Sequence, residues 1–179
     1  TGCLWDGNLK IGDKDGSIEI GKAKWDKKKM FGLDAPKAKL TTKISTEDGT
    51  MYYFTDLSEK DAEKYVEMLQ EKGFTYNKIV YDDYSYTGTN KEGETIAFLY
   101  DKDSGSGTIS SSKGEKPSEE DNDEVVIGGN KKWDSKKMGG LPDPGTKVVG
   151  YWSVNDQTCY TLEPLSDYED YLDKIKECG

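Results

Sequence analysis

Apolar and polar positions recur along this chain of 179 residues as two copies of one pattern. Residues 21–57 return at a constant offset of 108, with GKAKWDKKKMFGLDAPKAK opening the first copy and GNKKWDSKKMGGLPDPGTK the second. The matched markers are Trp25 and Trp133, Met30 and Met138, Leu33 and Leu141, and Pro36 and Pro144. So many identities at one offset predict a tandem duplication.

Each copy then predicts an amphipathic helix after a shared Leu-Ser pair. Ser58 and Ser166 suit N-caps, because an acidic residue follows three positions later in both copies. Apolar residues at helical spacing predict one buried stripe per helix: Ala62, Tyr65, Val66 and Leu69, then Tyr168, Tyr171, Leu172 and Ile175. Gly73 and Gly179 fall where a left-handed C-cap belongs.

Segments with alternating residues, separated by turn residues, predict β-strands. In the first copy these are residues 39–45, 51–55, 74–81, 84–89, 95–100 and 107–112. Residues 8–21 predict a further hairpin, turning at 13–16. The order predicts an α+β fold of tandem small modules, each an antiparallel sheet with one helix packed on a face (β-β-α-β-β-β).

The expected organisation is an N-terminal segment (1–20), a first module (21–112), a flexible acidic linker (113–124) and a truncated second module (125–179). Two strands and one helix are too little sheet for independent stability. Either the native chain continues past Gly179, or other strands complete the sheet, with the hairpin of residues 8–21 as one donor. We expect the continuation.

Three cysteines bear on the compartment. Cys3 follows a small residue and Gly, as the lipidated cysteine of a bacterial lipoprotein does, although an ordinary cysteine is the alternative. Cys159 opens a strand and Cys178 closes the following helix, so an antiparallel return brings the two within disulfide reach. We expect a Cys159–Cys178 disulfide and an oxidising compartment; two reduced thiols are the alternative.

Composition excludes several kinds of chemistry. The chain has 35 acidic residues, 25 basic residues that are all Lys, no His, and a net charge of -10. Without His, Ser-His and Cys-His nucleophiles and His-ligated metals are excluded; without Arg, so are guanidinium clamps. The acidic balance argues against nucleic acid, and against a membrane except through a lipid anchor.

No motif predicts catalysis or a cofactor. Residues 13–19 resemble part of a calcium loop, but Ile11 and Lys22 occupy two required ligand positions, so a hairpin turn is favoured. Paired carboxylates remain as the one catalytic option, and no pair lies in a motif. We therefore expect no enzyme activity, no cofactor and no metal site.

Aromatic residues supply the candidate binding positions. Trp25 and Trp133 invite sugar stacking, but their retention in both copies favours a shared packing role. Strand aromatics that differ between the copies are better candidates for a contact surface: Tyr81, Tyr84, Tyr86 and Trp152. The alternative for these four is packing within the sheet.

The order Trp-x4-Met-x2-Leu-x-x-Pro, two strands and a Tyr-Val-x-x-Leu-x-x-x-Gly-Phe helix ending resembles a family of uncharacterised Firmicutes surface lipoproteins. Leu141-Pro142-Asp143-Pro144 fits the family's Leu-Pro-x-Pro element, whereas residues 33–36 have lost one Pro. The resemblance implies lipid anchoring at Cys3 and tandem modules, with no established activity to carry over.

Together these features predict an extracytoplasmic, lipid-anchored protein of a Gram-positive cell surface. We expect a non-enzymatic binding or interaction module whose partner is a cell-envelope protein or glycan. Carbohydrate or peptidoglycan binding through the strand tyrosines is the first alternative, and a carboxylate-based hydrolase is the second.

Overall fold

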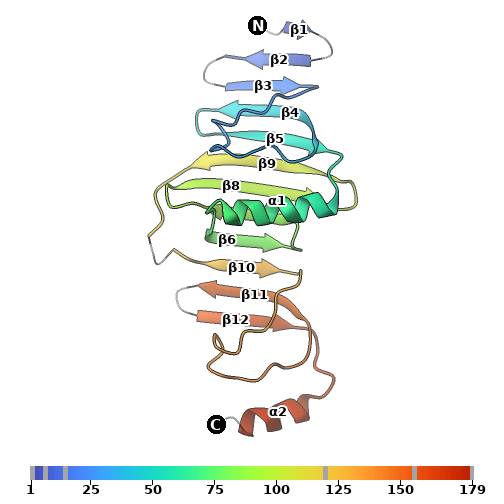
Figure 1. Cartoon of the computed structure of the whole chain (residues 1–179), viewed down its shortest axis with the longest axis vertical. Coiled ribbons are helices and arrows are strands. Elements are labelled where there is room, and N and C mark those ends of the chain that lie inside the picture. Colours follow the sequence, from blue (N-terminus) through green and yellow to red (C-terminus); the bar gives the residue numbers. More distant parts are fainter. Residues whose placement is uncertain (1–2, 6–7, 14–15, 119–120, 155–156, 178–179) are drawn as a thin grey trace.

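The computed structural model describes residues 3–5, 8–13, 16–118, 121–154 and 157–177. These residues form one sheet of 12 strands in the order β1-β2-β3-β4-β5-β9-β8-β7-β6-β10-β11-β12, with two helices (Figure 1). The strands are β1 (Cys3–Trp5), β2 (Asn8–Gly12), β3 (Gly16–Ile20), β4 (Lys39–Thr46), β5 (Gly49–Thr55), β6 (Tyr76–Tyr81), β7 (Ser85–Thr89), β8 (Glu94–Asp101), β9 (Ser106–Lys113), β10 (Glu124–Ile127), β11 (Val148–Val154) and β12 (Gln157–Leu162). The helices are α1 (Glu59–Glu71) and α2 (Tyr168–Glu177).

The prediction of two separate α+β modules is wrong, because the second copy extends the sheet of the first. β10 pairs in parallel with β6, with Val125 opposite Ile79, and every other strand pair is antiparallel within the described residues. An edge strand offers unpaired N–H and C=O groups, and β10 satisfies those of β6. The result is a mostly-sheet fold with one continuous mixed sheet.

The residues that precede β10 also form hydrogen bonds with β6. The backbone N–H of Lys78 in β6 donates to the carbonyl of Asp123, 2.7 Å away, and the N–H of Asn77 donates to Asp121. Part of the segment expected to be a flexible linker therefore runs along β6. Lys78 and Glu124, which face each other across the pair, also form an ion pair at 3.3 Å.

The duplication is visible as matched elements, at the offset of 108 for the strands and at an offset of 106 for the apolar stripe of the helix. β10, β11 and β12 correspond to β3, β4 and β5, and α2 corresponds to α1. In the first copy the chain then forms β6 to β9, and β9 inserts beside β5. The hairpin of β2 and β3 pairs with β4, so it does not complete the second copy as one alternative supposed.

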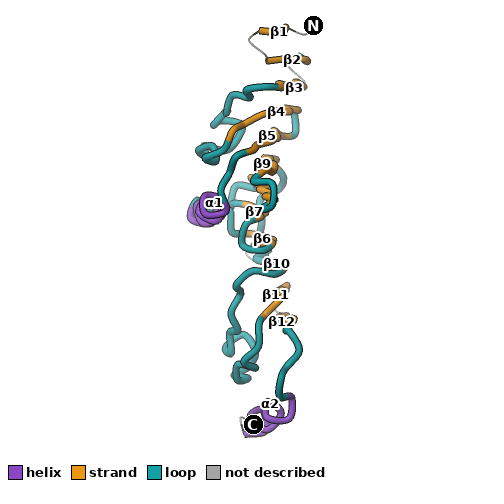
Figure 2. Tube along the Cα trace, turned by 90° about the vertical axis from the view of Figure 1, so that its right-hand side faces the viewer, coloured by secondary structure: helices purple, strands orange, loops and turns teal. Residues whose placement is uncertain are grey.

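One side of the sheet carries the core. α1, the loop from β3 to β4 and the loop from β10 to β11 lie on this side (Figure 2), which we call the helix side. The buried residues of α1 are the four predicted stripe residues, and they pack against buried strand residues of the first copy. That cluster contains Met30, Leu33, Tyr52, Phe54, Leu57, Ala62, Tyr65, Val66, Leu69, Phe74, Tyr86, Ile96, Phe98 and Ile109.

The predicted helix ends are confirmed in the first copy and shifted in the second. The Ser58 side chain accepts the N–H of Asp61 at 3.2 Å, and Gly73 has the left-handed φ of 88°. In the second copy the cap is Asp167 rather than Ser166, because Asp167 Oδ1 accepts the N–H of Asp170 at 2.9 Å. Gly179 lies outside the described residues.

Candidate interaction surface

In the described part of the chain, no helix lies on the side of the sheet opposite α1 (Figure 2), and we call that side the bare face. Strand residues alternate between the two sides, so register assigns each residue to a side. One row crosses the bare face from β2 to β12 without a break: Ile11, Ile18, Ile44, Met51, Ser110, Ala97, Thr87, Ile79, Val125, Trp152 and Cys159. No member of this row is charged.

Large apolar side chains are exposed along this face. Tyr81 has 53% of its surface exposed, Leu99 has 55% and Ile127 has 48%. The other exposed ones on this face are Ile11, Ile18, Ile20, Tyr53, Ile79 and Trp152. Contiguous exposed apolar surface on a folded protein marks an interaction site more often than isolated apolar residues do.

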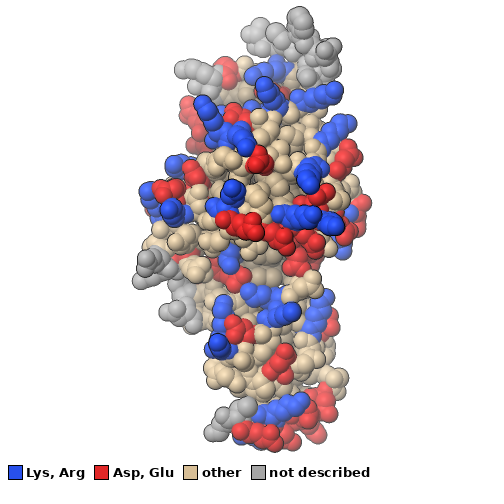
Figure 3. Space-filling view, viewed as in Figure 1, with Lys and Arg blue, Asp and Glu red and all other residues tan. Residues whose placement is uncertain are grey.

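Charge is segregated to the helix side. The charged strand residues on that side are Lys10, Glu19, Lys43, Lys78, Glu94, Lys113 and Glu124. Among the described strand residues only Lys39 and Asp101, each at a strand end, fall on the bare side. Figure 3 shows lysine and acidic side chains spread over the helix side. In a chain with 34% charged residues, this segregation makes the bare face the candidate interaction surface.

The four predicted contact aromatics divide between the two sides. Tyr81 and Trp152 lie on the bare face and are exposed. Tyr86 is buried in the core, where its hydroxyl donates to the carbonyl of Phe74. Tyr84 is half-buried and packs edge-on against Tyr100, with 6.1 Å between ring centres. Of these four aromatics, Tyr81 and Trp152 are therefore the two that a partner on this face can contact.

The aliphatic members of the bare face were missed by the sequence reasoning. Ile79, Leu99 and Ile127 each sit in a predicted or observed strand, next to a residue that packs inward. The available signal was a short run of apolar residues on both alternating positions, as in Val125, Val126 and Ile127. Such runs are typical of strands that are covered on both faces.

Trp25 and Trp133 have equivalent surroundings. Trp25 donates to the carbonyl of Leu33 at 2.9 Å and packs against Tyr52, with 4.7 Å between ring centres. Trp133 donates to Leu141 at 3.2 Å and packs against Tyr160 at 4.9 Å. Both indoles lie on the helix side and fasten the loop that carries them, which supports the packing role over sugar stacking.

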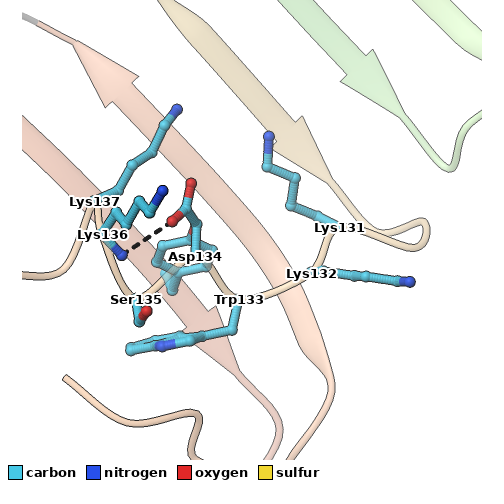
Figure 4. A pocket seen from close by; sticks show the side chains of 8 residues that line it. Lys131, Lys132, Trp133, Asp134, Ser135, Lys136 and Lys137 are labelled. Atoms are coloured by element: carbon cyan, nitrogen blue, oxygen red, sulfur yellow. Dashed lines mark hydrogen bonds between the residues drawn. The ribbon is translucent and has the colours of Figure 1, made fainter. Parts of the chain in front are cut away.

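The Trp133 loop (residues 129–146) borders a shallow hollow of about 610 Å³ on the helix side. Lysines stand around Trp133 in this hollow (Figure 4): Lys131, Lys132, Lys136 and Lys137. Lys131 is already paired with Glu124 at 3.1 Å, and Lys137 donates to the Tyr151 hydroxyl at 2.7 Å. Two of the four ammonium groups are thus engaged within the protein, so the hollow is a weak candidate for an anion site.

Glu124 is the most enclosed acidic group of this region. Burial favours its neutral form, but Lys78 and Lys131 lie close enough to outweigh burial and to lower the pKa of the Glu124 carboxyl. Each carboxyl group whose pKa is shifted within the described residues has it lowered: Asp34, Asp61, Glu92, Asp101, Asp121 and Glu124. A general acid at neutral pH needs the opposite shift.

The predicted cysteine sites are reached only in part. The backbone of Cys3 belongs to β1, and its lipidation stays a prediction. Cys159 is half-buried and has no disulfide partner among the described residues, and the residue opposite it across the strand pair is Trp152 on the bare face. Cys178 lies outside the described residues, so the Cys159–Cys178 disulfide stays a prediction that titration of native thiols, with Cys159→Ser as reference, would test.

We also searched the described part of the chain for metal sites and membrane-spanning helices. There, no group of three or more His, Cys, Asp or Glu residues is placed to hold a metal ion. None of its helices is long and apolar enough to cross a membrane. Comparison of the chain with protein-family models, with curated proteins and with solved structures finds no match.

Proposed function

We propose that this protein is a non-enzymatic interaction module of the cell envelope, which binds a protein partner through its bare face. The observation that carries the proposal is the uncharged row from Ile11 to Cys159, on a sheet whose other side is charged. Removing apolar surface from water favours association by about 25 cal/mol per Å². An uncharged face avoids the cost of stripping water from ions when a partner covers it.

The chemistry of the face favours a protein over a glycan. Trp152 and Tyr81 are the exposed aromatics in its second half, and their neighbours Ile79, Val125 and Ile127 are aliphatic. Sugars need hydrogen-bonding side chains beside the stacking ring, whereas aliphatic neighbours suit the apolar centre of a protein interface. Peptidoglycan binding through Trp152 and Tyr81 is the second candidate, favoured by the exposure of these two rings.

Lipidation at Cys3 fits this role and is part of the proposal. The sheet order puts β1 and β12 at opposite ends. With strands about 4.8 Å apart, the sheet extends about 50 Å from one end to the other. A lipid on Cys3 would hold β1 at the membrane and present the bare face along the height of the molecule.

Photo-crosslinking on the cells that express the protein tests the proposal. A benzophenone side chain replaces Ile127 or Leu99 on the bare face, and Glu67 on the exposed side of α1 as the control. We expect a discrete protein adduct from the two bare-face positions and none from position 67. Ile79→Lys should reduce the adduct at position 127 about tenfold, because a lysine must then be desolvated.

Two results would contradict the protein reading. Equal adducts from position 67 and position 127 would show that contact is not confined to the bare face. Sedimentation with purified peptidoglycan that Trp152→Ala abolishes, without any protein adduct, would assign the face to a glycan instead.

A further inference from the structure

The second copy repeats the local contacts of the first without their burial. The hydroxyl of Tyr65 donates to the carbonyl of Asp34 at 2.7 Å, and its counterpart Tyr171 donates to Pro142 at 3.1 Å. Yet α1 contains four buried residues and α2 contains none. Ala62 is fully buried, while its counterpart Tyr168 is 61% exposed.

The strands and the loop of the second copy are also less buried than their counterparts in the first copy. The first-copy residues Met30, Leu33, Tyr52 and Phe54 are all buried. Their counterparts are all only half-buried: Met138, Leu141, Tyr160 and Leu162. The hydroxyl of Tyr52 accepts the N–H of Asp26 at 2.9 Å and donates to Lys24 at 3.0 Å. The buried hydroxyl of Tyr160 lies beside the Asp134 backbone without reaching hydrogen-bond geometry.

The first copy shows what provides the missing cover. β9 pairs with β5 and puts Ile109 opposite Tyr52. Phe98 of β8 stacks on Phe54, with 5.5 Å between ring centres, and meets Tyr65 of α1 at 5.0 Å. The β8–β9 hairpin thus covers the edge of β5 and the apolar stripe of α1 together.

In the second copy, the equivalent strand β12 lies at the edge of the sheet. Within the described residues, β12 has β11 as its one strand neighbour. The N–H of Glu163 donates to Lys147 on the β11 side at 2.9 Å. Alternation along a strand then directs the N–H groups of Cys159 and Thr161 toward β11, and those of Thr158, Tyr160 and Leu162 toward the open edge.

We propose that the β12 edge and the apolar stripe of α2 form an acceptor site for a β-hairpin of the β8–β9 kind, supplied by a further copy of the same repeat unit. The incoming edge strand pairs antiparallel with β12, as β9 does with β5. An apolar residue in the place of Ile109 then covers Tyr160, and an aromatic in the place of Phe98 covers Leu162 and Tyr171. This is strand addition to an exposed sheet edge.

A peptide with the sequence of residues 94–113, added to the full chain, tests the site by amide hydrogen exchange. We expect exchange at Thr158, Tyr160 and Leu162 to slow at least about tenfold, because these amides gain partners. Exchange at Cys159 and Thr161 should change little, since their N–H groups already donate to β11. A peptide with Ile109 replaced by Pro lacks an N–H that would face β12, because Ile109 is the partner of Tyr52 in the first copy. It serves as the control and should leave all five amides unchanged.

Variants of the chain separate this site from the bare face. Thr158→Pro removes one outward N–H and keeps the pairing with β11, so we expect about tenfold weaker peptide binding. Thr158→Val keeps that N–H and should bind as the wild type does. Ile127→Lys alters only the bare face and should also bind normally, so failure of the proposed function would leave this result intact.

Three outcomes would overturn the proposal. The first is an absence of protection at the three outward amides at millimolar peptide. The second is protection that spreads equally over all five amides. The third is protection that exists without peptide and increases with protein concentration, which would assign the β12 edge to a second copy of this chain.

Discussion

The Ser111 hydroxyl in β9 donates a hydrogen bond to the backbone carbonyl of Lys29, with 2.7 Å between the two oxygen atoms. This bond joins the Trp25 loop (residues 21–38) to a strand that enters the sheet 82 residues later. Because β9 lies beside β5, the loop is held from two directions. Among the described residues, the second copy has no strand that corresponds to β9 and could hold the Trp133 loop in this way. Met138 and Leu141 of that loop are only half-buried.

Ser111→Ala should therefore lower the free energy of unfolding by about 1 kcal/mol, because the part-buried hydrogen bond to the Lys29 carbonyl is lost. Urea denaturation followed by tryptophan fluorescence measures the change. Ser110→Ala is the matched control, since Ser110 lies on the bare face, and should stay within about 0.5 kcal/mol of the wild type. Equal effects of the two variants would show that the loop does not depend on Ser111.

The two copies supply a matched pair of tyrosines. Tyr52→Phe removes two hydrogen bonds of a fully buried ring and should cost about 1–3 kcal/mol of unfolding free energy. Tyr160→Phe removes a buried hydroxyl that has no hydrogen-bond partner among the described residues, so it should be neutral or slightly stabilising. The measurement is again urea denaturation, and a larger loss for Tyr160→Phe than for Tyr52→Phe would contradict the structural difference between the copies.

The burial of the Tyr52 phenol also predicts a loss of stability at alkaline pH. Burial raises the pKa of Tyr52 to about 12. The neutral phenol is thus favoured in the folded chain, so its contribution is complete below the unfolded pKa of about 10. That contribution is lost as the pH rises through about 12. Tyr52→Phe should flatten the fall in melting temperature between these limits, and an unchanged slope would contradict the assignment.

The ion pairs of Glu124 at the junction of the two copies predict a loss of stability at acid pH. The pKa of its carboxyl is lowered in the folded chain, so the anion paired with Lys78 and Lys131 stabilises the junction above the unfolded pKa of about 4.3. Glu124→Gln should cost about 1 kcal/mol at neutral pH. The difference from the wild type should vanish as the pH falls through the lowered pKa. A difference that is constant across pH would show that Glu124 acts by shape alone.

Substitutions at Leu69 and Ile175 compare the burial of the matched apolar positions in α1 and α2. Leu69 is fully buried in α1, so Leu69→Ala should cost about 2–5 kcal/mol of unfolding free energy. Ile175 is its half-exposed counterpart in α2, and Ile175→Ala should cost under about 1 kcal/mol. Addition of the 94–113 peptide should enlarge the cost of Ile175→Ala and leave that of Leu69→Ala unchanged.

Local sequence patterns were sufficient for most elements of the fold. The alternation in residues 95–100 and 107–112 predicted β8 and β9 to within one residue at each end. Ser58, Asp61 and Gly73 fixed the ends of α1, because caps depend on groups within one turn of the helix. The second cap shifted to Asp167, since the helix offset of 106 differs from the strand offset of 108 and Asp167 is also a good cap residue.

The candidate surface depended on information that no local pattern contains. Tyr81 and Tyr86 look alike in sequence, yet one is exposed on the bare face and the other is buried under α1. The assignment of a strand residue to a side follows from register and from where the helix packs. Both depend on partners that are distant in sequence, such as the contact of Phe98 with Tyr65.

The sequence by itself determined the duplication, the strands of the first copy, α1 and the loops that Trp25 and Trp133 fasten, because each of these depends on contacts between near neighbours or on identity between copies. Only the tertiary structure decided that β6 and β10 join in parallel to make one sheet. Strand edges carry the same N–H and C=O groups whatever their side chains, so an edge does not record its partner in the sequence. The uncharged bare face and the open β12 edge are consequences of that pairing.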